Sequence, residues 1–312
     1  MKASFENTKH WYFVGSIMYN LDDLETFIAV VENKGVLAAA REQRLSPATV
    51  SHRLSKLERE LATVLVFRDS RRVRLSPAGQ LFYTRVGAII EALHDAEHSI
   101  GARGSSISGL LRVTMPPWIF SKYVMAKLTE FEQMYPDLKL DFLITDHFIN
   151  VVDDAQDVAI RVGQLNDSGL LSRKIINNSR ILCAAPSYIK KHGTPKNLTQ
   201  LAEHYWVCLP WQRQLKLFDE QGEIHTFNAQ TRFTISNSDN MTQAAIAGHG
   251  IAIKSKIAIK EELNSGALIE IMAGALAQSD APVWFLRPQN SLTTRKTDVF
   301  YDFMKSLFVS DK

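Results

Sequence analysis

The sequence predicts an α/β protein in three parts: an N-terminal winged helix-turn-helix, one long linker helix, and a pair of lobes in which strands and helices alternate. Three observations predict this class. A short amphipathic helix with a strong start signal occupies residues 46–61, two β segments follow it at 64–75, and strands alternate with helices from residue 109 onward. A chain of 312 residues is long enough for two or three such domains.

The helix that begins after Ser46 is the most informative element. Ser46 is a good N-cap, and Pro47 has the φ angle that the first helical position requires. Four apolar residues then recur at helical spacing and predict one buried face: Val50, Leu54, Leu57 and Leu61. The opposite face begins with small or hydrogen-bonding side chains, so the helix can enter a DNA major groove and contact base edges. Taken alone, the segment fits an ordinary amphipathic surface helix equally well.

Two further helices are expected upstream. The first covers 22–31, where Asp22 and Glu25 have the spacing of a capping box. Gly35 then breaks the chain, and a short helix follows at 38–41. This helix and the one after Ser46 are joined by a tight turn, which predicts a helix-turn-helix.

A small basic wing is expected after these helices. Residues 64–67 and 72–75 predict two short strands around a turn at 69–71. Residues 41–74 contain nine Lys or Arg and four acids, although the whole chain carries a net charge of only +3. This cluster predicts contacts with DNA phosphates, the alternative being a basic face that is merely solvated. The candidate DNA-binding residues are Ser46, Pro47, Ala48, Thr49, Ser51, His52, Arg53, Lys56, Arg68, Arg71, Arg72 and Arg74.

In these segments the chain resembles the LysR-type transcriptional regulators. The matching runs are residues 38–40, 45–51, 57–58 and 71–79, together with Leu61 and Arg68, and the resemblance continues to the C-terminus. It implies a sequence-specific DNA-binding regulator of transcription with a winged domain at 18–77, controlled by a small-molecule effector. Residues 1–17 have no counterpart in the family, so they are either an overlong start-site assignment, which we favour, or a real extension.

The chain departs from the family pattern in the scaffold of the helix-turn-helix. Residues 36–37 make a run one residue shorter than usual, and the Ser or Thr that normally caps the second helix is missing. Gln43 stands where a buried leucine is usual, and Arg44 where a turn glycine is usual. A left-handed Arg costs about 1 kcal/mol or more, and a buried glutamine without a partner costs about 1–3 kcal/mol. These changes bear on the angle at which the domain docks on DNA.

A long helical pattern at 78–104 is the expected linker. About 26 residues of helix would extend about 39 Å, and a helix of this length with a narrow apolar seam needs a partner. The resemblance implies an antiparallel pair of linker helices in a dimer, two dimers forming a tetramer, and hence an interrupted palindromic operator; packing of the seam against its own chain is the alternative. The seam consists of Leu81, Ile89, Ile90, Leu93 and Ile100.

Residues 109–312 predict α/β lobes with mainly parallel sheets. Runs at 157–163, 182–186 and 248–253 resemble the periplasmic-binding-protein-like effector domain of the same family. The expected first lobe covers about 109–183 plus 288–312, and the second about 184–287. Helices are expected near 121–135, 148–154, 240–247 and 293–308.

The cleft between the lobes is the expected effector site. Ligands of such lobes lie at the carboxyl ends of strands and at helix N-termini, which favour anions, so we expect a small organic anion. Arg161 could pair with its carboxylate or form a structural ion pair, and Trp118, where the family has a small hydroxyl residue, would narrow the cleft or stack on a ligand. Trp206 and Trp211 could line the second lobe, although core packing is the safer expectation. The candidate residues are Thr114, Pro116, Trp118, Thr145, Asp146, Arg161, Asn237 and Asp239.

Composition argues against several other classes of protein. Cys183 and Cys208 fit a reducing cytoplasm without disulfides, and no Cys/His cluster has metal-ligand spacing, so neither a metal nor another cofactor is expected. No apolar run approaches the roughly 20 residues of a membrane span, and no secretory signal is evident. The cleft candidates contain no nucleophile–base pair, which argues against an enzyme. The main alternative is a solute-binding protein of the same two-lobe fold, which the basic winged helix opposes.

Overall fold

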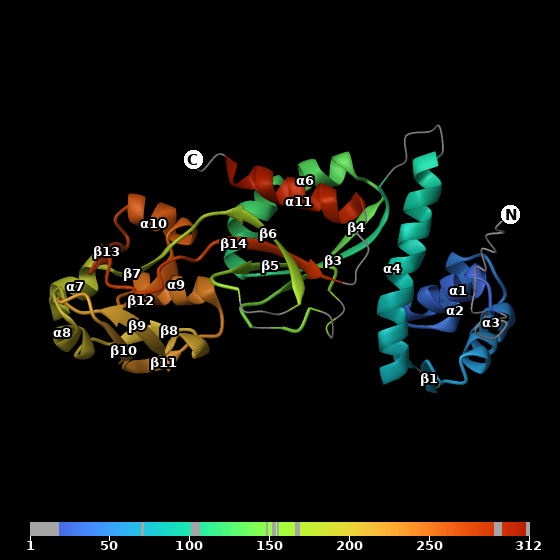
Figure 1. Ribbon diagram of the computed structural model, residues 1–312, viewed down its shortest axis with the longest axis horizontal. Helices are drawn as coiled ribbons and strands as arrows, with labels where there is room; N and C mark the ends of the chain where they lie inside the picture. Colours follow the sequence, from blue (N-terminus) through green and yellow to red (C-terminus); the bar gives the residue numbers. More distant parts are fainter. Residues whose placement is uncertain are drawn as a thin grey trace, which may run out of the picture. The chain divides into compact units, whose positions relative to one another are not determined.

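The computed structural model describes residues 19–69, 72–100, 107–147, 149–151, 154, 156–165, 169–289 and 295–309. The chain forms two compact units, Met1–Glu97 and His98–Lys312 (Figure 1). No helix among the described residues is long and apolar enough to cross a membrane.

The first unit is a winged helix-turn-helix. Its elements are α1 (Leu21–Glu32), α2 (Val36–Glu42), α3 (Pro47–Glu60), the antiparallel wing strands β1 (Val66–Asp69) and β2 (Arg72–Leu75), and α4 (Pro77–Ile100). The apolar faces of α1, α2, α3 and α4 meet in one core, because α1, α3 and α4 carry large apolar side chains at helical spacing and α2 contributes the small Ala39 and Ala40. The centre of that core is formed by Phe27, Val30, Ala39, Val50, Leu54, Leu57 and Leu65.

The helix ends of this unit differ in part from expectation. The capping box of α1 is formed by Asn20 and Asp23, with the Asp23 N–H donating to Asn20 Oδ1 at 3.0 Å and the Asn20 N–H donating to Asp23 Oδ2 at 3.1 Å. The expected pair of Asp22 and Glu25 was therefore wrong, because the helix begins at Leu21. At α2, Gly35 is the N-cap and supplies no side-chain hydrogen bond, as the missing hydroxyl residue implied.

The two unusual turn residues are accommodated differently. Arg44 has a φ of 55°, so a non-glycine residue does occupy the left-handed turn. Gln43 is only half-buried, and its Oε1 accepts a hydrogen bond from Thr26 Oγ1 at 3.1 Å. The glutamine thus has a partner, which offsets the cost expected for burying it.

The second unit contains the two lobes. A five-stranded sheet organises the first lobe, in the order β4 (Leu138–Ile144), β3 (Gly109–Met115), β5 (Val158–Val162), β14 (Val283–Pro288) and β6 (Leu170–Ile176). Its helical elements are α5 (Pro117–Ile119), the π-helix η1 (Phe120–Val124), α6 (Met125–Met134) and α11 (Arg295–Leu307). Phe131, Phe300 and Phe303 pack against one another in the core of this lobe, with ring centroids 4.6–5.9 Å apart.

The second lobe has a three-stranded sheet in which β7 (Arg180–Ala184) lies between β12 (Ala252–Ser255) and β13 (Ile269–Ile271). A parallel pair, β8 (Trp206–Cys208) and β11 (Thr231–Thr234), and a hairpin of β9 (Gln214–Phe218) and β10 (Ile224–Asn228) complete its strands. Its helices are α7 (Pro186–His192), α8 (Leu198–Ala202), α9 (Ser238–Ile246) and α10 (Lys260–Asn264), with 3₁₀ turns η2 (Pro210–Gln212) and η3 (Ile257–Ile259).

Three expectations for the lobes need correction. The sheets are not mainly parallel. The five-stranded sheet is mixed, because β14 runs antiparallel to β5 and β6, and the three-stranded sheet is antiparallel, because β7 runs antiparallel to β12 and β13. The chain passes into the second lobe before β7 and returns to the first lobe before β14. The expected lobe boundaries, at 183/184 and 287/288, therefore lie a few residues too late in the sequence. A return strand that inserts between β5 and β6 is fixed by long-range pairing, which the order of strands along the chain does not reveal.

The third correction concerns the helix expected at 148–154. The described part of this stretch is a turn, in which the Asp154 N–H donates to the Asn150 carbonyl at 2.9 Å. Phe148, Val152 and Asp153 lie outside the described residues.

Candidate functional site

The start of α3 presents a polar, accessible turn. Ser46 caps the helix, its Oγ accepting from the Thr49 N–H at 3.0 Å, and Pro47 occupies the first helical position. Ser46, Pro47, Ala48 and His52 are exposed, whereas Thr49 and Ser51 are half-buried. The opposite face is fully buried through Val50, Leu54 and Leu57. The outward face of α3 is therefore free for base edges in a major groove.

Two of the expected phosphate-binding cations are engaged within the domain. Arg53 Nη2 lies 2.9 Å from Asp22 Oδ2, and Lys56 Nζ lies 2.8 Å from the nearly buried Asp23 Oδ2. Both pairs fix α3 against α1, so these cations orient the helix in the free protein. Arg74 on β2 is exposed. Arg71 and the side chains of Arg68 and Arg72 lie outside the described residues.

Helix α4 carries two apolar stripes, not one seam. Tyr83, Val86 and Ile90 are 6–8% exposed. By contrast Leu81, Ile89 and Leu93 are 51%, 57% and 39% exposed and recur on the other face of the helix. Ile90 was therefore wrongly grouped with the seam, because it is buried within the chain. The side chain of Ile100 lies outside the described residues.

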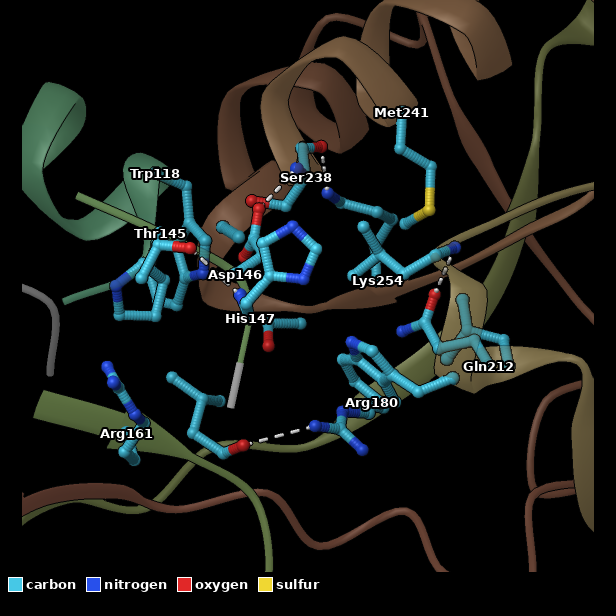
Figure 2. A pocket seen from close by; sticks show the side chains of 17 residues that line it. Trp118, Thr145, Asp146, His147, Arg161, Arg180, Gln212, Ser238, Met241 and Lys254 are labelled. Carbon is cyan, nitrogen blue, oxygen red and sulfur yellow. Dashed lines mark hydrogen bonds between the residues drawn. The ribbon is translucent and has the colours of Figure 1, made fainter. Parts of the chain in front are cut away.

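A cleft with a volume of about 80 Å³ is lined by residues of both lobes (Figure 2). Of the eight expected effector residues, five line it: Pro116, Trp118, Thr145, Asp146 and Arg161. They stand at or near the carboxyl ends of β3, β4 and β5, where the pattern of such lobes predicts a ligand.

The other three expected effector residues do not line the cleft. Thr114 is fully buried and accepts from Arg161 Nη2 at 3.1 Å. Asn237 is the N-cap of α9, its Oδ1 accepting from the Asp239 N–H at 2.9 Å. Asp239 Oδ2 accepts from Ser121 Oγ at 3.2 Å, a contact between the lobes.

The second-lobe wall was largely missed from the sequence. It includes Arg180 at the start of β7, Ser238 at the start of α9 and Lys254 within β12, as well as Trp211 and Gln212 of η2. Trp211 is 41% exposed and lines the cleft, whereas Trp206 is core. A lysine directly after the apolar run 251–253 was the signal that could have revealed Lys254.

Arg161 and Arg180 face the cleft from opposite lobes (Figure 2). Arg161 donates to Thr114 and to the Ile160 carbonyl at 3.0 Å, and no carboxylate of a described residue lies within ion-pair distance. Burial lowers its pKa to about 10, although the charge of Asp146 opposes that shift. Arg180 donates to the Val162 carbonyl at 3.1 Å and lies over the Trp211 ring, 5.3 Å from its centroid; burial lowers its pKa. Both guanidiniums remain cationic at neutral pH.

Lys254 and Asp146 meet at Ser238. Lys254 Nζ donates to the Ser238 carbonyl at 2.7 Å, and the Ser238 N–H donates to Asp146 Oδ2 at 2.5 Å. Burial lowers the pKa of Lys254 to about 8, and burial raises the pKa of Asp146 against the opposing effect of its Ser238 hydrogen bonds. Asp146 is the one carboxylate among the described lining residues, against the cations Arg161, Arg180 and Lys254. The cleft is thus a cationic site that favours an anion.

Comparisons with known proteins agree with both parts of this architecture. Residues 21–80 match the sequence family described as bacterial regulatory helix-turn-helix protein, lysR family. Residues 104–308 match the family described as LysR substrate binding domain. Similar proteins include the HTH-type transcriptional regulator DmlR of Escherichia coli K12, 28% identical over 92% of this chain and 94% of that protein. The HTH-type transcriptional regulator CrgA of Neisseria meningitidis is 27% identical over 91% of this chain and 96% of its own.

A solved structure extends the likeness to nearly the whole chain. The full-length virulence activator AphB of Vibrio cholerae, a member of the LTTR protein family, has 26% identity and a TM-score of 0.55, covering 92% of this chain and 99% of its own. The family and the α/β fold class expected from the sequence are confirmed, and the related proteins are regulators, not enzymes. The chain belongs to the LysR family of transcriptional regulators, with a helix-turn-helix that binds DNA and a substrate-binding domain that binds a small-molecule effector.

Proposed function

We propose that this regulator binds an interrupted palindromic operator in double-stranded DNA, as a dimer that pairs into a tetramer, under the control of a small organic anion in the cleft. The site of action is the cytoplasm, where its DNA target lies. The observation that carries the effector class is the charge of the cleft: three cations, Arg161, Arg180 and Lys254, surround a single carboxylate, Asp146.

The DNA-binding part of the proposal rests on two exposed surfaces. The outward turn of α3, at Ser46, Pro47, Ala48 and His52, suits base contacts, and Arg74 on β2 suits a phosphate contact. The exposed stripe of α4 supports dimerisation, because three large apolar side chains on one helix face are costly in water: Leu81, Ile89 and Leu93. Symmetric pairing presents two copies of α3, which is why the operator is expected to be palindromic.

The anion can control the regulator because the cations that would bind it lie on different lobes. Arg161 belongs to the first lobe, while Arg180 and Lys254 belong to the second. An anion that contacts both sides stabilises one relative position of the lobes, and shifts the population toward it in proportion to its differential affinity. A change in lobe position then changes how the assembled chains present α3 to DNA.

The experiment is calorimetric titration of the full chain with a panel of small mono- and dicarboxylates, compared with uncharged amides of the same size. Binding of one or more carboxylates, weakened at least tenfold in Arg180→Met and unchanged in Lys191→Met, supports the cleft. Lys191 is an exposed lysine of α7, so Lys191→Met removes one positive charge away from the cleft and serves as the matched control. Binding of the amides alone, or equal loss in both variants, would contradict an anion site at Arg180.

A further inference from the structure

Lys254 is an unusual side chain to find in this cleft. Its residue is only 4% exposed, and its ammonium makes one hydrogen bond, to the Ser238 carbonyl at 2.7 Å. No carboxylate of a described residue lies within 4.0 Å of it. An ammonium has three N–H donors, so two of them have no acceptor among the described residues, and Lys254 lines the cleft. A buried charge without a counter-charge is costly, which points to a ligand-related role.

A second observation at the same place concerns the hydroxyl of Ser238. Ser238 is 5% exposed, and its Oγ is buried with no partner at full hydrogen-bonding distance, although it lies near enough to the Asp146 carboxylate to help lower the pKa of that group. Ser238 opens α9, a helix of nine residues, and lines the cleft together with Lys254. Buried hydroxyls normally have a partner, and the Ser238 hydroxyl can still make a hydrogen bond with a molecule bound beside Lys254.

The surroundings of Lys254 lower the pKa of its ammonium and so increase the neutral fraction of its amine. Burial lowers its pKa to about 8, and the charge of Lys122 acts in the same direction, while Cys183, Asp239 and Asp146 oppose it. At pH 7 roughly a tenth of the side chain would be neutral, against well under a thousandth for an ordinary lysine. A desolvated lysine with a neutral fraction of this size is a nucleophile for carbonyl groups.

We propose that Lys254 captures its effector as a reversible imine, and that the effector is a small carboxylic acid carrying an aldehyde or ketone, such as a 2-oxo acid. The inference rests on the proposed function, because Arg161 and Arg180 bind the carboxylate of the same molecule. The amine nitrogen attacks the carbonyl carbon and forms a C–N bond. The carbonyl oxygen leaves as water with both amine hydrogens, and no electrons are exchanged. Ser238 lines the same cleft, and its hydroxyl can donate to the carbonyl oxygen while the bond forms.

The test is reductive trapping in the full chain. The protein is incubated with glyoxylate or pyruvate and sodium cyanoborohydride, which converts an imine to a stable secondary amine, and the modified lysines are identified by peptide mass spectrometry. We expect saturable modification of Lys254, roughly a few hundredfold faster than that of an ordinary exposed lysine on the basis of the neutral fractions. Lys256, two residues away with a 56% exposed side chain, is the internal comparison.

Variants and a parallel titration make the outcome decisive. Lys254→Arg keeps the charge but cannot form the imine, and should lose trapping, whereas Lys256→Arg should keep it. Equal trapping at Lys254 and at exposed lysines would overturn the inference, and so would calorimetric binding of both probes without any trapping. That last result leaves the anion site of the proposed function standing. If no carboxylate binds the wild-type chain, the proposed function itself fails.

Discussion

The carboxylate of Asp146 accepts the backbone N–H of Ser238 at 2.5 Å, and so joins the first lobe to the start of α9 in the second lobe. A helix N-terminus favours a negative charge because its N–H groups are unpaired and the helix dipole is positive there. Asp146 therefore occupies a position that the carboxylate of an effector would also favour. Its negative charge opposes anion binding in an otherwise cationic cleft.

Replacing Asp146 with asparagine should raise the affinity for small carboxylates. The amide oxygen of Asp146→Asn can still accept from Ser238, while the charge that repels the ligand is gone. We expect about tenfold tighter binding, equivalent to about 1.4 kcal/mol, measured by calorimetry. Asp141→Asn, on the exposed side of β4, is the control. A loss of affinity in Asp146→Asn would instead mean that Asp146 binds the effector directly.

Lys254→Met should stabilise the free protein at pH 7. A buried ammonium without a counter-charge is costly, and an apolar replacement of similar volume can add roughly 1–4 kcal/mol to the free energy of unfolding. The folded pKa of about 8 lies below the ordinary 10.5, so between these values the unfolded state binds more protons and wild-type stability rises with pH. The advantage of Lys254→Met should shrink over that interval. Urea unfolding at pH 7 and pH 10 measures it; a less stable variant at pH 7 would show that the hydrogen bond to Ser238 outweighs the buried charge.

His52 and Arg74 should have different roles on DNA. His52 is exposed on the outward face of α3, so His52→Ala should cost about 1–3 kcal/mol at the operator and little on random DNA. Arg74→Ala should weaken both kinds of DNA and lower the salt slope by about 1, as for one lost phosphate contact. Fluorescence anisotropy at several salt concentrations separates the two. If His52→Ala lost the same affinity for the operator and for random DNA, His52 would only position the protein on DNA and would not contact bases.

Leu93 and Ile90 provide a matched pair on α4. Leu93→Lys puts a charge on the exposed stripe, and should give monomers with intact domains and almost no operator binding. Ile90→Lys puts the same charge in the buried stripe, and should lower the stability of the first unit because an unpaired charge is buried. Sedimentation and circular dichroism distinguish the two results. If Leu93→Lys remains an oligomer that binds DNA, the exposed stripe is not the dimer contact.

Local signals in the sequence were enough to predict α3 and the wing that follows it. Ser46 and Pro47 fix the start of α3 through short-range chemistry, and the spacing of Val50, Leu54 and Leu57 fixes its buried face. The start of α1 was missed by one residue, because Asn20 and Asp22 are both acceptable caps and only the structure shows which one receives the Asp23 N–H.

The cleft could be predicted only on its first-lobe side. Thr145, Asp146 and Arg161 follow strands that periodicity reveals, so their common edge could be inferred. Arg180 and Lys254 come together through the antiparallel pairing of β7 and β12, in which Ser255 lies opposite Arg180. Pairing between segments more than 70 residues apart leaves no local pattern. Helical spacing places Ile89 and Ile90 about 100° apart around α4, but it does not show which of the two the rest of the chain covers.

The most direct test is whether a cleft anion changes DNA binding through the cleft itself. A labelled fragment from upstream of the protein's own gene is titrated with the full chain, with and without a saturating carboxylate found by calorimetry, for wild type, Arg180→Met and Lys191→Met. We predict that the carboxylate changes the DNA dissociation constant at least about fivefold, a coupling of about 1 kcal/mol, in wild type and Lys191→Met, and leaves it nearly unchanged in Arg180→Met. An equal response in all three proteins, or none in wild type, would contradict control through this cleft.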